Sequence, residues 1–148
     1  MEDRDALLRH YRRMHDELVA QIDGLTDEQM SDPSLDGWSV KDHLGHLAAW
    51  DEIRAAEIER ISAGHASAWR MSREQAHAYN ALAYDLRHNL SAAQLRWELD
   101  ATREHLLDAI ASANDRALDG SLYGEAGLRS THEAEHTEWI GRWRAEGR

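Results

Sequence analysis

The chain has 148 residues, a formal net charge of −11 and no cysteine. A chain of this length can bury a core of its own, so we expect a single domain over residues 1–148. The lack of cysteine excludes disulfides, thiolate nucleophiles and cysteine-ligated zinc. The acidic balance, with basic residues scattered along the chain, argues against a nucleic-acid partner.

No apolar run approaches the ~20 residues needed to span a bilayer. The charged N-terminus leads into no apolar segment typical of a secretion signal. We therefore expect a cytoplasmic protein with no membrane partner.

The composition is rich in Ala, Leu, Glu and Arg, with one proline, and predicts a mostly helical chain. The first helix is expected over residues 4–23, with Gly24 ending it. Its apolar stripe comprises Leu7, Leu8, Tyr11, Leu18, Val19 and Ile22. Thr26-Asp-Glu-Gln29 is a capping box that opens one short turn, and a loop follows over 31–37.

Serines typical of helix N-caps open three more helices, expected over 39–62, 72–89 and 91–114. A loop with three glycines is expected over 119–127, and a last helix over 128–145. No segment alternates with period two, so no sheet is expected. These elements predict an all-α four-helix bundle with a subdivided middle crossing.

The last helix carries the most informative pattern in the chain. Leu128, His132, His136, Trp139 and Trp143 are spaced by four, four, three and four residues, which places them on one helical face. Two inward imidazoles one turn apart are a usual way for a helix to hold two ligands of a transition metal. Burying these imidazoles and a third one opposite them without partners would cost several kcal/mol, out of a total free energy of unfolding of roughly 5–15 kcal/mol. A bound cation removes that cost.

A third ligand is expected from the helix over 39–62. His46 lies between two apolar stripes, one through Trp50 and one through Leu44 and Leu47, and should point inward. His43 lies nearer the helix start, where it either stays solvated or faces a substrate opening. We therefore favour His46 over His43 as the ligand.

Other polar residues near these positions are weaker candidates. His132-Glu-Ala-Glu-His136 spells the zinc-protease signature, but too few residues follow for a third ligand and no substrate-aligning strand is expected. We expect Glu133 to face solvent. The alternative is that it contacts the metal ligands from behind and acts as a base. Glu57 is the one obvious inward carboxylate, and His15, at the edge of an apolar face, lacks a partner at fixed spacing.

The block Gly37-Trp-Ser-Val-Lys-Asp-His-Leu-Gly-His46-Leu-Ala-Ala-Trp50, together with the terminal His132-x-x-x-His136, resembles the DinB/YfiT-like superfamily. Its form is most similar to the ClbS/DfsB branch. The resemblance implies a four-helix bundle with a three-histidine site for a divalent metal such as zinc or nickel. The family's three ligands fall on His46, His132 and His136. Characterised members include thiol-dependent transferases and isomerases, and a hydrolase that inactivates a reactive cyclopropane.

These observations lead to an expected metal-dependent enzyme that acts on a small molecule, as a hydrolase or a thiol-dependent transferase using a low-molecular-weight thiol. The pocket around the metal is expected to include His43, Trp50 and Trp139, while Tyr123 either orients a substrate or simply packs. The alternative is a metal- or ligand-binding bundle without turnover. Related bundles often pair, so a homodimer is also expected.

Overall fold

The computed structural model describes residues 1–125 and 127–147, and these residues form helices and loops without any strand. The α-helices are α1 (Arg4–Ile22), α2 (Asp27–Ser31), α3 (Val40–Ser62), α4 (Arg73–Arg87), α5 (Ala92–Ala111) and α6 (His132–Ala145). Two short 3-10 helices, η1 (Arg116–Leu118) and η2 (Gly120–Tyr123), lie between α5 and α6. The predicted all-α class is confirmed.

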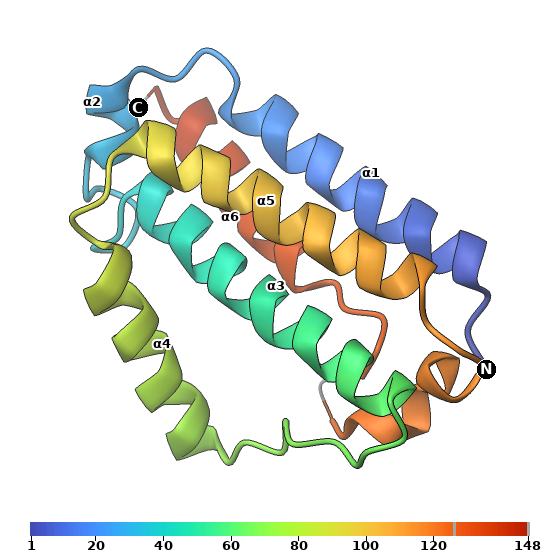
Figure 1. Ribbon diagram of the computed structural model, residues 1–148. Helices are drawn as coiled ribbons and strands as arrows, with labels where there is room; N and C mark the ends of the chain where they lie inside the picture. The colour runs from blue at the N-terminus through green and yellow to red at the C-terminus, as the bar shows by residue number, and fades with distance from the viewer. Residues whose placement is uncertain (126, 148) are drawn as a thin grey trace.

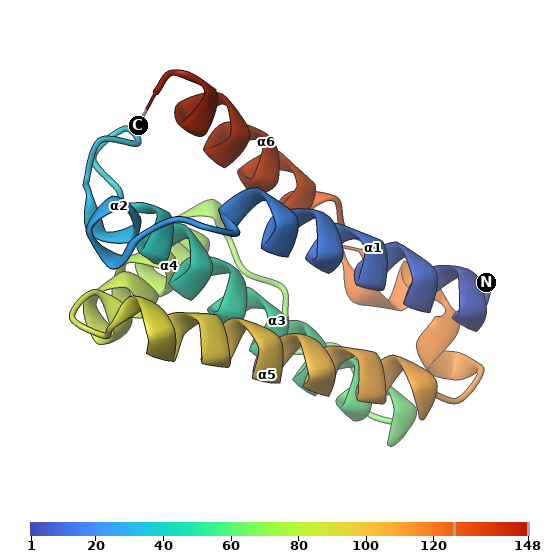
Figure 2. The ribbon, with the colours of Figure 1, turned by 90° about the horizontal axis from the view of Figure 1, so that it is seen from above.

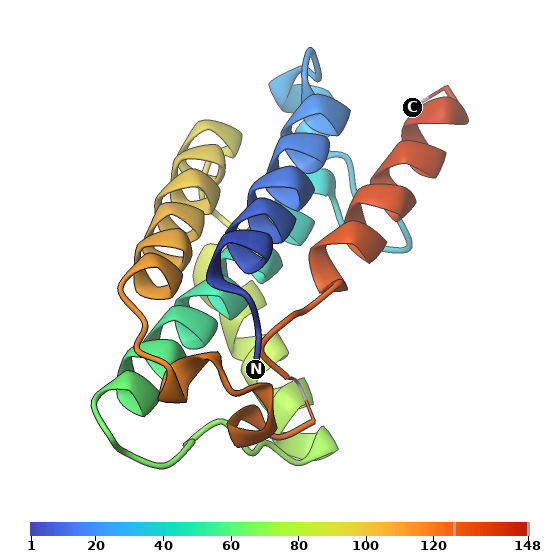
Figure 3. The same ribbon diagram turned by 90° about the vertical axis from the view of Figure 1, so that its right-hand side faces the viewer.

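The helices α1, α3, α5 and α6 form a bundle (Figure 1). The helix α3 packs along α5, and α1 packs along α6 and α5. Figure 2 shows α6 and α1 on one side of the bundle and α3 and α5 on the other. Figure 3 shows α5, α1 and α6 following one another across the molecule. The helix α4 packs against α3 outside the bundle, and with α5 it makes up the segment that the sequence predicts as a subdivided crossing.

Side-chain caps start most of the helices where the sequence predicts them. Thr26, Ser39 and Ser72 each form a reciprocal capping box with the residue three positions later. Ser91 accepts a hydrogen bond from the backbone N–H of Gln94. Each cap satisfies amide donors that the first helical turn leaves unpaired, so helix starts in this chain can be found from sequence.

The predicted stripe of α1 is correct except at one position. Val19 is 41% exposed, and Met14 is buried instead. The positions 7, 11, 14 and 18 are spaced by four, three and four residues, so Met14 falls on the centre of the buried face and Val19 beyond its edge.

The segment before α6 differs from the prediction in two places. The expected loop over 119–127 contains η2, while Ala126 lies outside the described residues. The helix α6 begins at His132, four residues later than expected. The Tyr11 hydroxyl on α1 donates to the carbonyl of Leu128 (2.6 Å) and accepts from the N–H of Ser130 (3.0 Å). In a helix starting at Leu128, the Leu128 carbonyl would accept from the N–H of His132. Here that carbonyl accepts from Tyr11, and the N–H of His132 donates to Ser130 Oγ instead.

The hydrophobic core is divided into two clusters. One contains Leu7, Tyr11, Ile58, Leu106 and Leu128, and the other contains Leu18, Leu44, Leu99, Ile140 and Trp143, with further members in each. Between the two clusters, the helices α3, α5 and α6 carry buried polar side chains. These are Asp51 and Arg54 on α3, Arg103 on α5, and Glu133 and His136 on α6. A polar layer therefore crosses the middle of the bundle, next to the histidine cluster.

None of the described helices combines the length and the apolar character needed to cross a membrane.

Candidate metal centre

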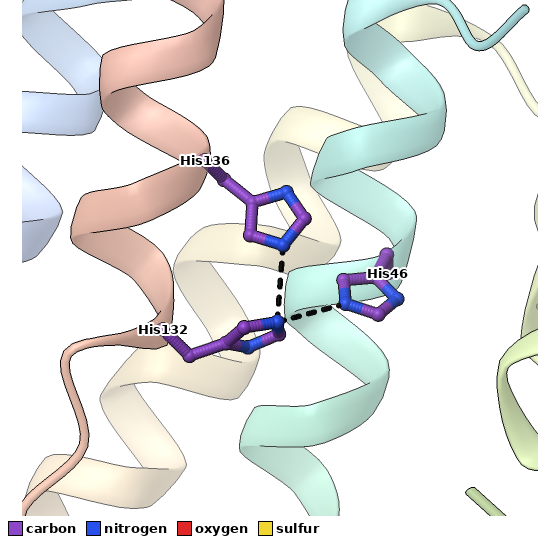
Figure 4. Close-up of side chains that lie close together, drawn as sticks. All are labelled: His46, His132 and His136. Carbon is purple, nitrogen blue, oxygen red and sulfur yellow. Dashed lines mark hydrogen bonds between the residues drawn. The ribbon is translucent and has the colours of Figure 1, made fainter. Parts of the chain in front are cut away.

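Three histidines from two helices point toward one another in the bundle (Figure 4). The Nε2 atom of His132 lies 3.1 Å from Nε2 of His46 and 3.0 Å from Nε2 of His136. One ligand nitrogen from each residue falls within 4.8 Å of the other two. His46 and His136 are buried and His132 is half-buried. The pair on α6 and the single histidine on α3 are thus brought together as the sequence suggests.

Local structure places each of these side chains. Ser130 Oγ accepts the backbone N–H of His132 (3.1 Å) and fixes the first residue of α6. One turn later His136 follows on the same face, ahead of the buried Ile140 and Trp143. On α3, Gly45 lets other elements approach closely, since a Cβ there would lie 3.3 Å from the Arg87 side chain.

The imidazoles of this cluster are held in the neutral form. Burial, together with the smaller effect of neighbouring imidazoles, lowers the pKa of His46 to about 3 and that of His136 to about 2. Burial also lowers the pKa of His132. Neutral imidazole is the form that binds a transition metal, so the charge state of the cluster is already that of a ligand set.

Hydrogen bonding alone leaves the cluster poorly satisfied. Nε2 of His132 faces two other Nε2 atoms but has either one proton or one lone pair, so it cannot make two well-directed hydrogen bonds. Nδ1 of His46 is also buried without a hydrogen-bond partner among the described residues. A cation at the meeting point would use the lone pairs of all three nitrogens. The residues therefore fit a divalent metal ion.

A buried arginine joins the helices that carry the histidines. Arg103 on α5 donates to both carboxylate oxygens of Asp51 on α3, at 2.9 and 3.1 Å. It also donates to Glu133 on α6 (2.7 Å) and to the carbonyl of Tyr11 on α1 (2.8 Å). Asp51 lies five residues after His46, and Glu133 directly follows His132, so this Arg103 clamp sets α6 against α3 beside the cluster.

The clamp corrects the expectation that Glu133 faces solvent. Its side chain is 3% exposed, and burial raises its pKa to about 7 although Arg103 lowers it. The helix turns ~100° per residue, which takes Glu133 away from the histidine face, but Arg103 on α5 covers that side too. Sequence periodicity misses Asp51 and Arg103 as well. The sequence signal that could have identified these two residues is a charged side chain at a core position of an otherwise apolar helix face.

A cavity of about 400 Å³ opens beside two of the three histidines. It is lined by Leu35, Asp36, Trp38, His43, His46, His136 and Trp139. His43 is 6% exposed, so it is buried on the cavity wall rather than solvated. Trp139, expected on the inward face of α6 as a wall of the pocket, lines the cavity but is 41% exposed. The inward face of α6 passes through Ile140 instead.

The two remaining candidates for the pocket do not line this cavity. Trp50 contacts the rings of His46 and His132 at centroid distances of 6.3 and 6.4 Å, outside the cavity lining, and its indole N–H donates to Asn80. Tyr123 is buried in a hydrophobic cluster, where its hydroxyl donates to the Ala117 carbonyl (2.6 Å).

Two other polar residues considered from the sequence, Glu57 and His15, have partners outside the histidine cluster. The carboxylate of Glu57 accepts from Arg60 and from the backbone N–H of Ala68. His15 lies 2.9 Å from a carboxylate oxygen of Asp100.

Comparisons with known proteins agree with this fold. The uncharacterised protein YuaE of Bacillus subtilis (strain 168) is 28% identical in an alignment that covers 78% of this chain and 83% of that protein. A crystal structure of an uncharacterised protein from Escherichia coli UTI89 superposes with a TM-score of 0.79 at 17% identity, covering 99% of this chain and 95% of that one. A crystal structure of a protein from Streptococcus pneumoniae superposes with a TM-score of 0.78 at 11% identity, covering 98% of this chain and 92% of that one.

A family model covers most of the chain. The model of the DinB superfamily matches residues 10–140, a span that includes α3, the Arg103 clamp and all three clustered histidines. The chain belongs to the DinB superfamily.

Proposed function

We propose that this protein binds one divalent metal ion through His46, His132 and His136 and uses it to transform a small electrophilic molecule. The reaction class is hydrolysis or transfer of a low-molecular-weight thiol. The observation that carries the proposal is the convergence of three neutral imidazole nitrogens beside an open cavity. Imidazole ligands suit zinc and nickel among the divalent metals. The tryptophan-to-histidine block over 37–50 supports a place in the ClbS/DfsB branch.

Three protein ligands leave room for a further ligand, as in catalytic rather than structural zinc sites. A bound ion would supply Lewis acidity, which favours ionisation of water or a thiol near neutral pH. Because His46 and His136 also line the cavity, a molecule in the cavity reaches the cluster directly.

The cavity lining supports a small, partly apolar substrate. Its volume of about 400 Å³ lies in the usual range for small-molecule sites. Trp38 and Trp139 supply flat apolar walls that would pack against the substrate and exclude water. Asp36 is the one carboxylate among the residues that line this cavity.

The first test is elemental analysis of protein purified without added metal or a histidine tag, beside a His46→Ala/His136→Ala variant. We expect close to one zinc or nickel per chain in the parent and none in the variant. His105→Ala serves as the control, because His105 is half-exposed and pairs with Glu59. Absence of metal in the parent, even after reconstitution at pH 8, would refute the proposal.

Catalysis needs a second measurement. Metal-loaded protein would be screened against strained-ring and other small electrophiles, with and without added thiol, with the double variant as the blank. Metal-dependent turnover supports the enzyme. Metal binding with ligand uptake but no turnover across the screen would favour a binding bundle instead.

A further inference from the structure

One ligand of the proposed centre has a histidine behind it. Nδ1 of His136 lies 2.7 Å from Nδ1 of His43, which is three residues before His46 on α3. The two rings meet edge to face, with centroids 5.0 Å apart and planes at 67°. Both side chains are buried, with exposed fractions of 6% for His43 and 4% for His136.

The position of a single proton decides what this contact does. A neutral imidazole carries one proton, and a hydrogen bond between two Nδ1 atoms needs that proton on only one of them. If His43 donates, the proton of His136 is on Nε2, and this nitrogen has no lone pair for a metal. If His136 donates, its Nε2 lone pair is free and directed at Nε2 of His132, within the cluster that also holds His46.

We propose that His43 is the positioning residue of the metal centre: its Nδ1 accepts the Nδ1–H of His136 and thereby holds the Nε2 lone pair of His136 toward the metal. This inference rests on the proposed metal-binding function. Histidine ligands commonly donate their other ring N–H to an acceptor, which fixes the tautomer and strengthens the ligand. Here the acceptor is a second imidazole.

The surroundings of His43 favour this role over that of a fourth ligand. Its Nδ1 is directed at the far nitrogen of His136, and the nitrogens that converge belong to the other three histidines. The ring is held edge to face by Trp38, with centroids 5.2 Å apart, and Trp38 is stacked on Tyr84. The remaining nitrogen of His43, Nε2, carries the proton of the ring in this arrangement and is buried without a partner among the described residues.

The test compares zinc affinity in the parent and in variants of His43, by competition with a fluorescent chelator. His43→Leu fills the space but removes the acceptor, and should weaken zinc binding by roughly 10–100-fold. His43→Asn places its amide oxygen close to the position of Nδ1 and should recover most of that loss. His15→Leu, a histidine bonded to Asp100 outside the cluster, should leave the affinity unchanged.

Nitrogen NMR reads the tautomers directly. In the zinc-loaded parent, we expect the proton of His136 on Nδ1 and that of His43 on Nε2. The metal-free parent should keep His136 in the same form, and His43→Leu should lose this preference. Thermal unfolding of each variant shows whether it is folded.

The outcomes separate this inference from the proposed function. A parent that binds zinc together with a His43→Leu variant of equal affinity overturns the positioning role. Complete loss of metal in both His43→Leu and His43→Asn also overturns it, because His43 would then itself be a ligand. A parent that binds neither zinc nor nickel refutes the proposed function, and the tautomer of His136 in metal-free parent and variant then decides the inference alone.

Discussion

Removing the central arginine of the clamp should destabilise the protein strongly. Arg103→Met would leave Asp51 and Glu133 buried without their cation, with side chains only 8% and 3% exposed. Breaking a buried ion pair by deleting one partner costs about 3–5 kcal/mol. We expect a loss of that size in the free energy of unfolding, measured by urea denaturation at pH 7.5 with chelator present. The cost should be smaller at pH 5, where Glu133 takes up a proton more easily.

Two comparisons make this prediction specific. Arg142→Met removes an exposed arginine that pairs with Glu138 at 3.6 Å, and should change stability by less than about 1 kcal/mol. Replacing the triad together, with Asp51→Leu, Arg103→Met and Glu133→Leu, should restore most of the lost stability, since no charge is left uncompensated. A cost below about 1 kcal/mol for Arg103→Met, or the same cost at both pH values, would refute the reasoning.

Three further predictions concern single residues and the metal. Trp143→Ala should cost about 3–5 kcal/mol in urea unfolding because Trp143 is buried, whereas Trp139→Ala should cost clearly less. Burial raises the pKa of Glu133 to about 7, so the stability this group contributes at low pH is lost as the pH rises through 7. Glu133→Gln should therefore gain about 2–3 kcal/mol on the parent between pH 5 and pH 8, and a pH-independent difference would contradict this. Zinc at a hundred times its dissociation constant should stabilise the parent by about 2.7 kcal/mol, or roughly 5–10 °C in Tm, and should leave His46→Ala unchanged.

Local signals in the sequence account for most of the fold. Caps at Thr26, Ser39, Ser72 and Ser91 act within four residues, so they locate helix starts without knowledge of the rest of the chain. The start of α6 is different, because it is fixed by Tyr11 more than a hundred residues away. Periodicity cannot detect a constraint of that kind.

The same distinction explains which parts of the site the sequence predicts. The spacing of His132 and His136 indicates a shared face, and His46 stands between two apolar stripes, so the three could be grouped from pattern alone. Glu133 could not be assigned in this way. A glutamate on the side of a helix is normally solvated, and only its partner Arg103 on α5 shows that it is buried.

The polar layer is best understood through its cost. Apolar residues lie on both sides of it, and continuing them through the middle would avoid burying two carboxylates, two arginines and the imidazole of His136. Buried ion pairs are often no more stable than apolar replacements, so stability alone does not explain the layer. Its geometry offers a better explanation. Directional bonds from Arg103 to α1, α3 and α6 hold the helices in one arrangement, whereas apolar contacts tolerate sliding. A site with ligands on α3 and α6 needs that arrangement fixed, and the clamp lies where it can fix it.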